Sequence, residues 1–209
     1  MKLNVPSLVE CEESFIDAVV AQRTLEPNKT YFTDYKNTWK ARVNEYIDNS
    51  GNPEVILDST EVVNKKKFIN LYNTSEDSML QKAVIDSLRD RELQLCPACG
   101  ESGTPNTLDH YLPKDKYPEY AILSKNLFPM CDICQGKKLA TVLDQDERRI
   151  FLHPYYDDFL TEQVIELHID GPFNAPEGFN LNVVNSISEG LQELILRHLT
   201  GIELQSRYS

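Results

Sequence analysis

The 209-residue chain lacks any apolar run near the length of about 18 residues that a membrane-spanning helix needs. Its opening, Met1-Lys2-Leu3-Asn4-Val5-Pro6, also lacks the apolar core of a secretory signal. These absences predict a cytoplasmic protein with no membrane segment. Disulfide bonds are rare in such a reducing compartment, so the five cysteines need a different explanation.

Positive charge is also scarce, because the net charge is −12. Residues 1–95 carry 12 Lys/Arg against 16 Asp/Glu, residues 96–150 carry 7 against 8, and residues 151–209 carry 2 against 9. A free-standing duplex binder usually shows a basic face. The local basic set here is Lys114, Lys116, Lys125, Lys137, Lys138, Arg148 and Arg149. Either nucleic acid reaches the chain through a partner's basic surface, or the substrate is not nucleic acid.

Two Cys-x-x-Cys pairs dominate the middle of the chain: Cys96 with Cys99, and Cys131 with Cys134. Two thiolate pairs at this spacing predict a tetrahedral structural Zn²⁺ site. The alternatives are a redox pair, which would need only one such motif at the start of a helix, and four buried or disulfide-bonded cysteines. The remaining cysteine, Cys11, lies on an apolar helical stripe and is predicted to be a small core residue.

The sequence predicts an α+β protein in three regions. Residues 1–95 read as a helical scaffold or docking region. Apolar residues recur at helical spacing, with Gly and Pro between the segments. The first predicted helix starts around Leu8. Three more run from Thr33 to Ile47, from Lys65 to Tyr72 and from Ser78 to Leu95. The inward residues of the last one are predicted to include Met79, Ala83, Leu88 and Leu95.

Residues 96–150 form the cysteine-bracketed unit. Thr107 to Leu112 are predicted to form a short strand with Asp109 and His110 on opposite faces. A second extended segment leads to Cys131, and a helix follows from Asp132 to Leu143, with Asp132 as its N-cap and first-turn acid.

Residues 151–209 are predicted to form a C-terminal extension. The strands 164–169 and 179–184 would pair as a hairpin, followed by a helix from Gly190 to Leu204. No capping signal follows that helix. This pattern fits either a natural chain that continues past Ser209 or a frayed end.

Groups able to hydrolyse a phosphodiester lie between the two cysteine pairs. A neutral imidazole is a good base for water, so His110 is the predicted catalytic base. Carboxylate and amide oxygens suit Mg²⁺ or Mn²⁺, so Asp109 and Asn126 are predicted to hold a catalytic cation. Phosphates flanking the reacting one would contact Lys114, Lys137 or Lys138.

These residues resemble a known family. The sequence Cys-Pro-Ala-Cys-Gly, then Leu-Asp-His-Tyr-Leu-Pro, then Asn-Leu-Phe-Pro-Met-Cys-Asp-Ile-Cys-Gln-Gly-Lys, resembles the HNH (ββα-metal) endonucleases with a zinc knuckle. The resemblance implies a ββα-metal core, with His110 as general base, Asp109 as the metal-binding acid and Asn126 as the middle residue of the motif. The family usually has His or Asn where this chain has Gln135. Either Gln135 or a water would then be the third metal ligand, or the nuclease would be weakened.

The flanking sequences narrow the resemblance. Asp-His-Tyr-Leu-Pro-Lys-Asp-Lys-Tyr-Pro-Glu-Tyr and the later Phe-Leu-His-Pro-Tyr-Tyr-Asp look like the PtuB-like HNH subunit of Septu anti-phage systems, some of which are attached to retrons. This resemblance implies a nuclease subunit for antiviral defence, acting on DNA or RNA with an ATPase partner of the SMC/ABC type. The acidic helices would then be docking surface.

Two functional readings therefore stand at this point. One is a metal-dependent endonuclease, favoured by Asp109, His110 and Asn126 together. The other is a non-catalytic zinc-binding interaction module with a degenerate HNH motif, slightly favoured by Gln135. The other histidines carry less information: His153 suits packing, orientation of the site or phosphate binding, and His168 and His198 suggest no chemistry.

Overall fold

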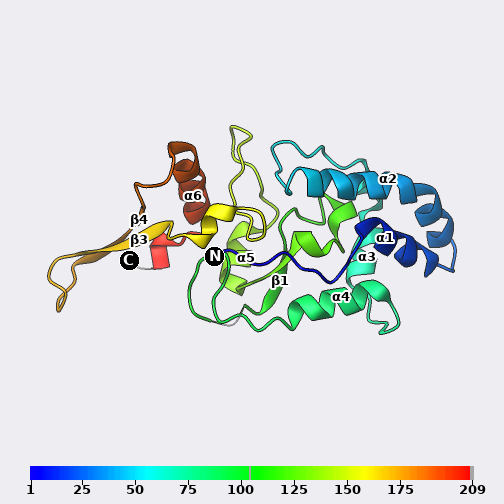
Figure 1. The fold of residues 1–209 in the computed structure, drawn as a ribbon, viewed down its shortest axis with the longest axis horizontal. Helices are drawn as coiled ribbons and strands as arrows, with labels where there is room; N and C mark the ends of the chain where they lie inside the picture. The colour runs from blue at the N-terminus through cyan, green and yellow to red at the C-terminus, as the bar shows by residue number, and fades with distance from the viewer. Residues whose placement is uncertain (104, 208–209) are drawn as a thin grey trace.

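The structure is a computed structural model that describes residues 1–103 and 105–207, and it is an α+β fold. Its helices are α1 (Glu12–Ala21), α2 (Asn28–Asp48), α3 (Lys65–Tyr72), α4 (Leu80–Arg89), α5 (Asp132–Lys138) and α6 (Glu189–Gly201). Its strands are β1 (Thr107–His110), β2 (Leu127–Met130), β3 (Ile165–Asp170) and β4 (Gly178–Val183). Helices α1 to α4 gather at one end of an elongated molecule, α5 and β1 lie in the middle, and α6 lies with β3 and β4 at the other end (Figure 1).

The N-terminal region is helical, as predicted. Helix α3 has the predicted bounds, because Lys65–Tyr72 combines an apolar face of Phe68, Leu71 and Tyr72 with a polar one. Helix α2 begins at Asn28 rather than Thr33. Helix α4 is shorter than predicted and ends at Arg89, so Leu95 lies beyond it and is exposed.

Besides Leu95, two other predicted core positions in this region are wrong. Ala83 is exposed on α4, where Gln81, Ile85 and Leu88 face inward instead. Cys11 is exposed because it precedes the first turn of α1. The next residue, Glu12, is buried in its place, with Oε1 3.4 Å from Nζ of Lys125.

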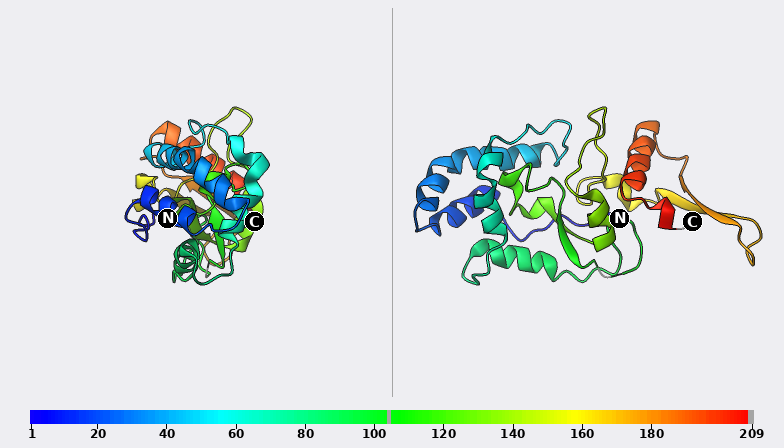
Figure 2. Two further views of the ribbon diagram at one scale, coloured as in Figure 1. Left: turned by 90° about the vertical axis from the view of Figure 1, so that its right-hand side faces the viewer. Right: turned by 180° about the vertical axis from the view of Figure 1, so that it is seen from behind.

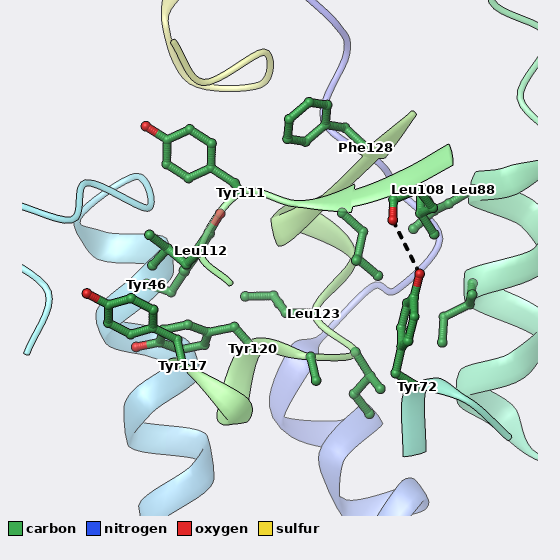
Figure 3. Packing of buried hydrophobic residues seen from close by; sticks show 14 of the residues in the cluster. Tyr46, Tyr72, Leu88, Leu108, Tyr111, Leu112, Tyr117, Tyr120, Leu123 and Phe128 are labelled. Atoms are coloured by element: carbon green, nitrogen blue, oxygen red, sulfur yellow. Dashed lines mark hydrogen bonds between the residues drawn. The ribbon is translucent and has the colours of Figure 1, made fainter. Parts of the chain in front are cut away.

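The predicted regions share one core, which includes buried residues from Leu3 to Leu204. Aromatic rings dominate it under the long loop between β1 and β2, where Tyr46, Tyr117 and Tyr120 lie together (Figure 3). Helix α2 holds this loop directly. Trp39 donates from Nε1 to the backbone oxygen of Glu119 at 2.7 Å, and Nε of Arg42 lies 3.3 Å from Oε1 of the same residue. The helical region is therefore a scaffold for the loop.

Strands β1 and β2 form an antiparallel hairpin in which Asp109 pairs with Phe128 and His110 with Leu127. Helix α5 follows immediately and packs against β1. Strand β1 ends at His110 rather than Leu112, and α5 ends at Lys138 rather than Leu143. The early end of α5 has a local cause, because Leu139 takes a positive φ of 48° that a helix cannot contain.

The second hairpin, β3 with β4, is antiparallel, as predicted, and projects away from the rest of the chain (Figure 2). Its register places three apolar pairs on one face: Ile165 with Val183, Leu167 with Leu181, and Ile169 with Phe179. Helix α6 packs against β4. Among the described residues, no helix has both the length and the apolar character needed to cross a bilayer.

Candidate functional site

Four cysteine sulfurs converge in the middle of the molecule. The Sγ atoms of Cys96, Cys99, Cys131 and Cys134 all lie within 4.8 Å of one another, and all four thiols are free. Sulfurs around one tetrahedral zinc ion sit roughly 3.8 Å apart, because each Zn–S bond is about 2.3 Å. The four residues therefore form a potential metal-binding site of a kind compatible with structural zinc.

Hydrogen bonds to these sulfurs come from the backbone and from one distant side chain. The Cys131 N–H donates to Cys96 Sγ and the Cys134 N–H donates to Cys131 Sγ, both at 3.4 Å. Cys131 is thus the N-cap of α5, and the predicted cap, Asp132, lies in the first turn. Arg207 donates from Nη2 to Cys134 Sγ at 3.3 Å. N–H donors of this kind favour the thiolate form that binds metal.

The turn between Cys96 and Cys99 is held by residues from the start of the chain and from α6. The N-terminal ammonium of Met1 donates to the Pro97 oxygen at 2.9 Å, and His198 on α6 donates from Nε2 to the Ala98 oxygen at 2.8 Å. The Leu152 N–H donates to His198 Nδ1, which fixes this tautomer. Burial lowers the pKa of His198 to about 4. No local sequence pattern indicated His198 or Arg207, because their partners Ala98 and Cys134 lie more than 70 residues away in the sequence.

Asp109 lies at the end of β1 and faces α5. Its Oδ1 accepts from Gln135 Nε2 at 3.4 Å, and its Oδ2 lies 2.9 Å from Lys138 Nζ. The Oδ2 contact is an ion pair without an aligned hydrogen bond, so this buried oxygen keeps unused bonding capacity. Lys138 is only 1% exposed, and Nζ donates to the His110 backbone oxygen at 2.7 Å. The structure therefore places Lys138, which the sequence predicts as a phosphate contact, with its ammonium buried between Asp109 and the His110 oxygen.

His110 faces the opposite way, toward the loop and α3. Its Nε2 lies 3.0 Å from the Ala121 backbone oxygen, and its ring packs edge-on against Tyr72 with centroids 4.6 Å apart. Burial, assisted by the charges of Lys114 and Lys138, lowers the pKa of His110 to about 3. The ring is therefore neutral near pH 7, with the proton on Nε2 donated to Ala121. Within the described parts of the chain nothing hydrogen-bonds to Nδ1, whose lone pair remains available.

Asn126 is completely buried and braces the loop that carries Ala121. Its Oδ1 accepts from the Leu112 N–H at 2.8 Å, while its Nδ2 donates to the Leu112 oxygen at 3.0 Å and to the Tyr120 oxygen at 3.1 Å. The amide is thus committed to the backbone on both sides. This bonding differs from the metal-ligand role expected for Asn126 from the sequence.

The other predicted residues occupy distinct places. Lys114 is half-buried beside Tyr72, with Nζ 5.4 Å from the ring centroid. Lys137 is exposed and lies 2.5 Å from Glu203, away from Asp109. His153 is fully buried, and its Nε2 lies 2.9 Å from the Tyr46 hydroxyl, which fits the packing role. His168 is exposed on β3.

The structure brings Gln135 and Lys138 to Asp109 and brings Tyr72, with Lys114 beside it, to His110, whereas Asp109 and His110 face opposite ways and Lys137 and His153 lie apart. The two residues, neighbours in sequence, offer a neutral imidazole with one available nitrogen and a carboxylate with one incompletely bonded oxygen. Such a pair can accept a proton from water and bind a hard cation.

Comparison with known proteins gives one relative. Over 111 residues the chain is 31% identical to a protein named ea31 from Escherichia phage lambda. The match covers 52% of this chain and 37% of the relative, so the chain spans little more than a third of that protein's length. No family model matches the chain, and no solved structure matches it.

Proposed function

We propose that this chain is a metal-dependent endonuclease of the HNH type, which hydrolyses phosphodiester bonds in nucleic acid. The observation that carries the proposal is that Asp109 and His110 are consecutive residues at the end of β1, in the hairpin that leads into α5. The imidazole is held by the Ala121 oxygen with Nδ1 available, and the neighbouring carboxylate keeps an underused oxygen. The likeness of the motif to HNH endonucleases supports the same reaction.

His110 would take the proton from the attacking water through Nδ1. The hydrogen bond from Nε2 to Ala121 keeps the proton off Nδ1 and prevents the ring from turning. The Nε2 proton stays on the ring when Nδ1 is protonated, so the same contact then stabilises the imidazolium. Ala121 thus acts as the orienting group that a catalytic histidine requires.

The residues around Asp109 fit a divalent cation of the Mg²⁺ or Mn²⁺ class. The incompletely bonded Oδ2 of Asp109 is a hard oxygen donor, and Gln135, which donates from Nε2 to Asp109 Oδ1, would offer its amide oxygen as a second donor once its amide group turned over. When bound, such a cation supplies positive charge to the scissile phosphate and to the leaving oxygen. The Lys138 ammonium would offset the negative charge of the buried Asp109 carboxylate.

We further propose Zn²⁺ as the ion at the four cysteines, with a structural role. Four thiolates leave no open coordination position, which is typical of structural rather than catalytic zinc. The site joins the turn before β1 to the start of α5, so it would hold the two elements that carry Asp109 and Gln135 in register.

A cleavage assay tests the nuclease proposal. Plasmid DNA and a structured RNA are incubated with the purified chain in Mg²⁺ or Mn²⁺, alongside His110→Ala and Asp109→Asn. We expect His110→Ala to lose cutting by at least about 100-fold, because proton transfer typically contributes 10²–10⁴-fold. Asp109→Asn should lose a similar factor, because the cation would lose its charged ligand. His168→Ala, at an exposed histidine, is the matched control and should cut normally. Equal cutting by wild type and His110→Ala would overturn the proposal.

A non-catalytic zinc interaction module is the second candidate, and the burial of the site favours it. His110 is only 5% exposed, and Lys138 already neutralises Asp109. Under this reading the wild type would bind zinc and a partner but leave both nucleic acids intact in either metal.

Charge supports a further proposal, that the chain works with a partner carrying a basic surface, as expected for an SMC/ABC-type ATPase. Residues 151–209 carry 2 Lys/Arg against 9 Asp/Glu, and the β3–β4 hairpin presents an apolar face on a projecting arm. Cleavage that appears only when such an ATPase is added would support this arrangement. Full activity of the isolated chain would argue against a required partner.

A further inference from the structure

Two cations gather around a single aromatic ring next to His110. Tyr72, the last residue of α3, packs its ring against the imidazole and donates its hydroxyl to the Leu108 oxygen on β1 at 3.3 Å (Figure 3). The guanidinium carbon of Arg89 lies 5.5 Å from the centroid of this ring, and Nζ of Lys114 lies 5.4 Å from it. Arg89 ends α4 and Lys114 follows β1, so two distant segments place positive charge at one point.

Neither cation is fully neutralised by a carboxylate. The contact of Arg89 with Asp86 is a long one, at 3.4 Å, and the Arg89 side chain is 48% exposed. Lys114 has no acidic partner within 4.0 Å among residues 1–103 and 105–207. Contact with the Tyr72 ring orients both side chains while leaving their charge available. In a chain of net charge −12, these two cations place positive charge beside the candidate base.

We propose that Arg89 and Lys114 form a phosphate-binding pair that holds the phosphates flanking the scissile one in a nucleic-acid strand. The inference rests on the proposed function for the position of the scissile phosphate, but it adds a residue from the N-terminal helices that no motif indicated. Tyr72 would be the positioning residue, because its ring contacts His110 and lies under both cations. The strand would then pass from the end of α4 to the loop after β1.

Binding measurements test the pair separately from catalysis. The probe is a fluorescein-labelled single-stranded DNA oligonucleotide, followed by anisotropy without added Mg²⁺ or Mn²⁺, and the same sequence as RNA and as duplex DNA. The proteins are wild type, Arg89→Gln, Lys114→Gln and the double variant. Lys66→Gln removes one charge from an exposed position on α3, the helix that carries Tyr72, and is the matched control.

We expect each single variant to weaken binding to the single strand about fourfold at 0.15 M salt, because losing one phosphate contact reduces the log–log salt slope by about 0.7 for a single strand. The double variant should lose both contacts, and KM for cleavage should rise while kcat stays within about twofold. Arg89→Lys and Lys114→Arg should keep the salt slope, since they retain the charge. A merely structural role would change the urea midpoint without changing the slope.

The outcomes separate this inference from the nuclease proposal. If the wild type cuts and both glutamine variants bind and cut like it, the phosphate pair is overturned and the nuclease stands. If the wild type binds but never cuts, alone or with the ATPase partner, and the variants lose binding, the pair stands and the nuclease falls. A wild type that neither binds nor cuts, alone or with that partner, would overturn both.

Discussion

The Nε2 atom of His110 lies 3.0 Å from the backbone oxygen of Ala121, and this contact decides which ring nitrogen can accept a proton. The position of Ala121 depends in turn on the loop between β1 and β2. The Asn126 side-chain amide donates to the backbone oxygens of Leu112 and of Tyr120, the residue before Ala121. The geometry of the imidazole is therefore set by a buried amide that does not touch it.

Substitutions at Asn126 distinguish a loop brace from a metal ligand. If Asn126 were a metal ligand, the protein would tolerate Asn126→Asp. In this structure the substitution instead places a carboxylate against the backbone oxygens of Leu112 and Tyr120. We expect Asn126→Asp and Asn126→Ala each to lower the free energy of unfolding by about 3 kcal/mol or more, because buried groups lose their partners. Urea unfolding of the zinc-loaded protein measures this. Asn70→Asp, at an exposed position on α3, is the control.

Activity of the Asn126 variants gives the second readout. A brace predicts that Asn126→Asp loses cleavage together with stability. If instead Asn126→Asp kept wild-type stability and cut normally in Mn²⁺, Asn126 would be better described as a ligand.

The adjacent lysines on α5 should behave differently. Lys138 is buried between Asp109 and the His110 oxygen, whereas Lys137 is exposed and pairs with Glu203. Lys138→Met leaves a buried carboxylate unpaired, and we expect a loss of about 3–5 kcal/mol in the free energy of unfolding. Lys137→Met should cost less than about 1 kcal/mol, as surface ion pairs do.

A double variant tests whether the cost of Lys138→Met comes from Asp109. Combining it with Asp109→Asn removes the unpaired charge, so part of the lost stability should return. Strictly additive losses in the two variants would show that the ion pair contributes nothing to folding.

The sequence predicted the elements of this fold better than the contacts between them. Helix α3 and the β3–β4 hairpin follow from periodicity within each segment, which needs no knowledge of distant residues. Lys138 could not be distinguished from Lys137 in this way. Both are basic residues near the end of one helix, and only packing against β1 determines which is buried.

The same limit explains the residues that were missed or misplaced. Cys11 continues an apolar stripe in the sequence, but α1 begins one residue later and buries Glu12 with Lys125 instead. Arg89 and Arg207 each reach their partners across long sequence separations, so no local pattern marks them. The cysteine pairs were predictable because metal-binding spacing is itself a local pattern.

Metal retention at the four cysteines should depend on Arg207. Its guanidinium donates to Cys134 Sγ and pairs with Glu101, so it covers one sulfur of the site. We expect Arg207→Ala to speed zinc release to a colorimetric chelator by about 10-fold, in the range found when groups that support metal ligands are removed. Cys134→Ser should abolish stoichiometric zinc and unfold the site. Cys11→Ser, at the exposed cysteine, should change neither. Identical release rates for wild type and Arg207→Ala would contradict this role.

The pH dependence of stability should carry the signature of His198. Burial lowers its pKa to about 4, whereas an unfolded chain has a histidine pKa of about 6.5. The unfolded state then binds more protons between these two values, so stability increases with pH across that window and is fully present above pH 6.5. His198 should contribute a loss of about 1.4 kcal/mol for each pH unit below 6.5, until pH 4.

Urea unfolding between pH 7.5 and 4.5 measures this contribution through the difference between wild type and His198→Gln. Glutamine can still donate to the Ala98 oxygen but does not titrate, so the stability gap between the two proteins should narrow as the pH falls. Zinc loss and the other buried histidines, His110 and His153, affect both proteins and cancel in that difference. His168→Gln should track the wild type at every pH, because that histidine is exposed on β3. A gap that stays constant with pH would mean that His198 is protonated equally in both states, and that its bond to the cysteine turn does not depend on the neutral ring.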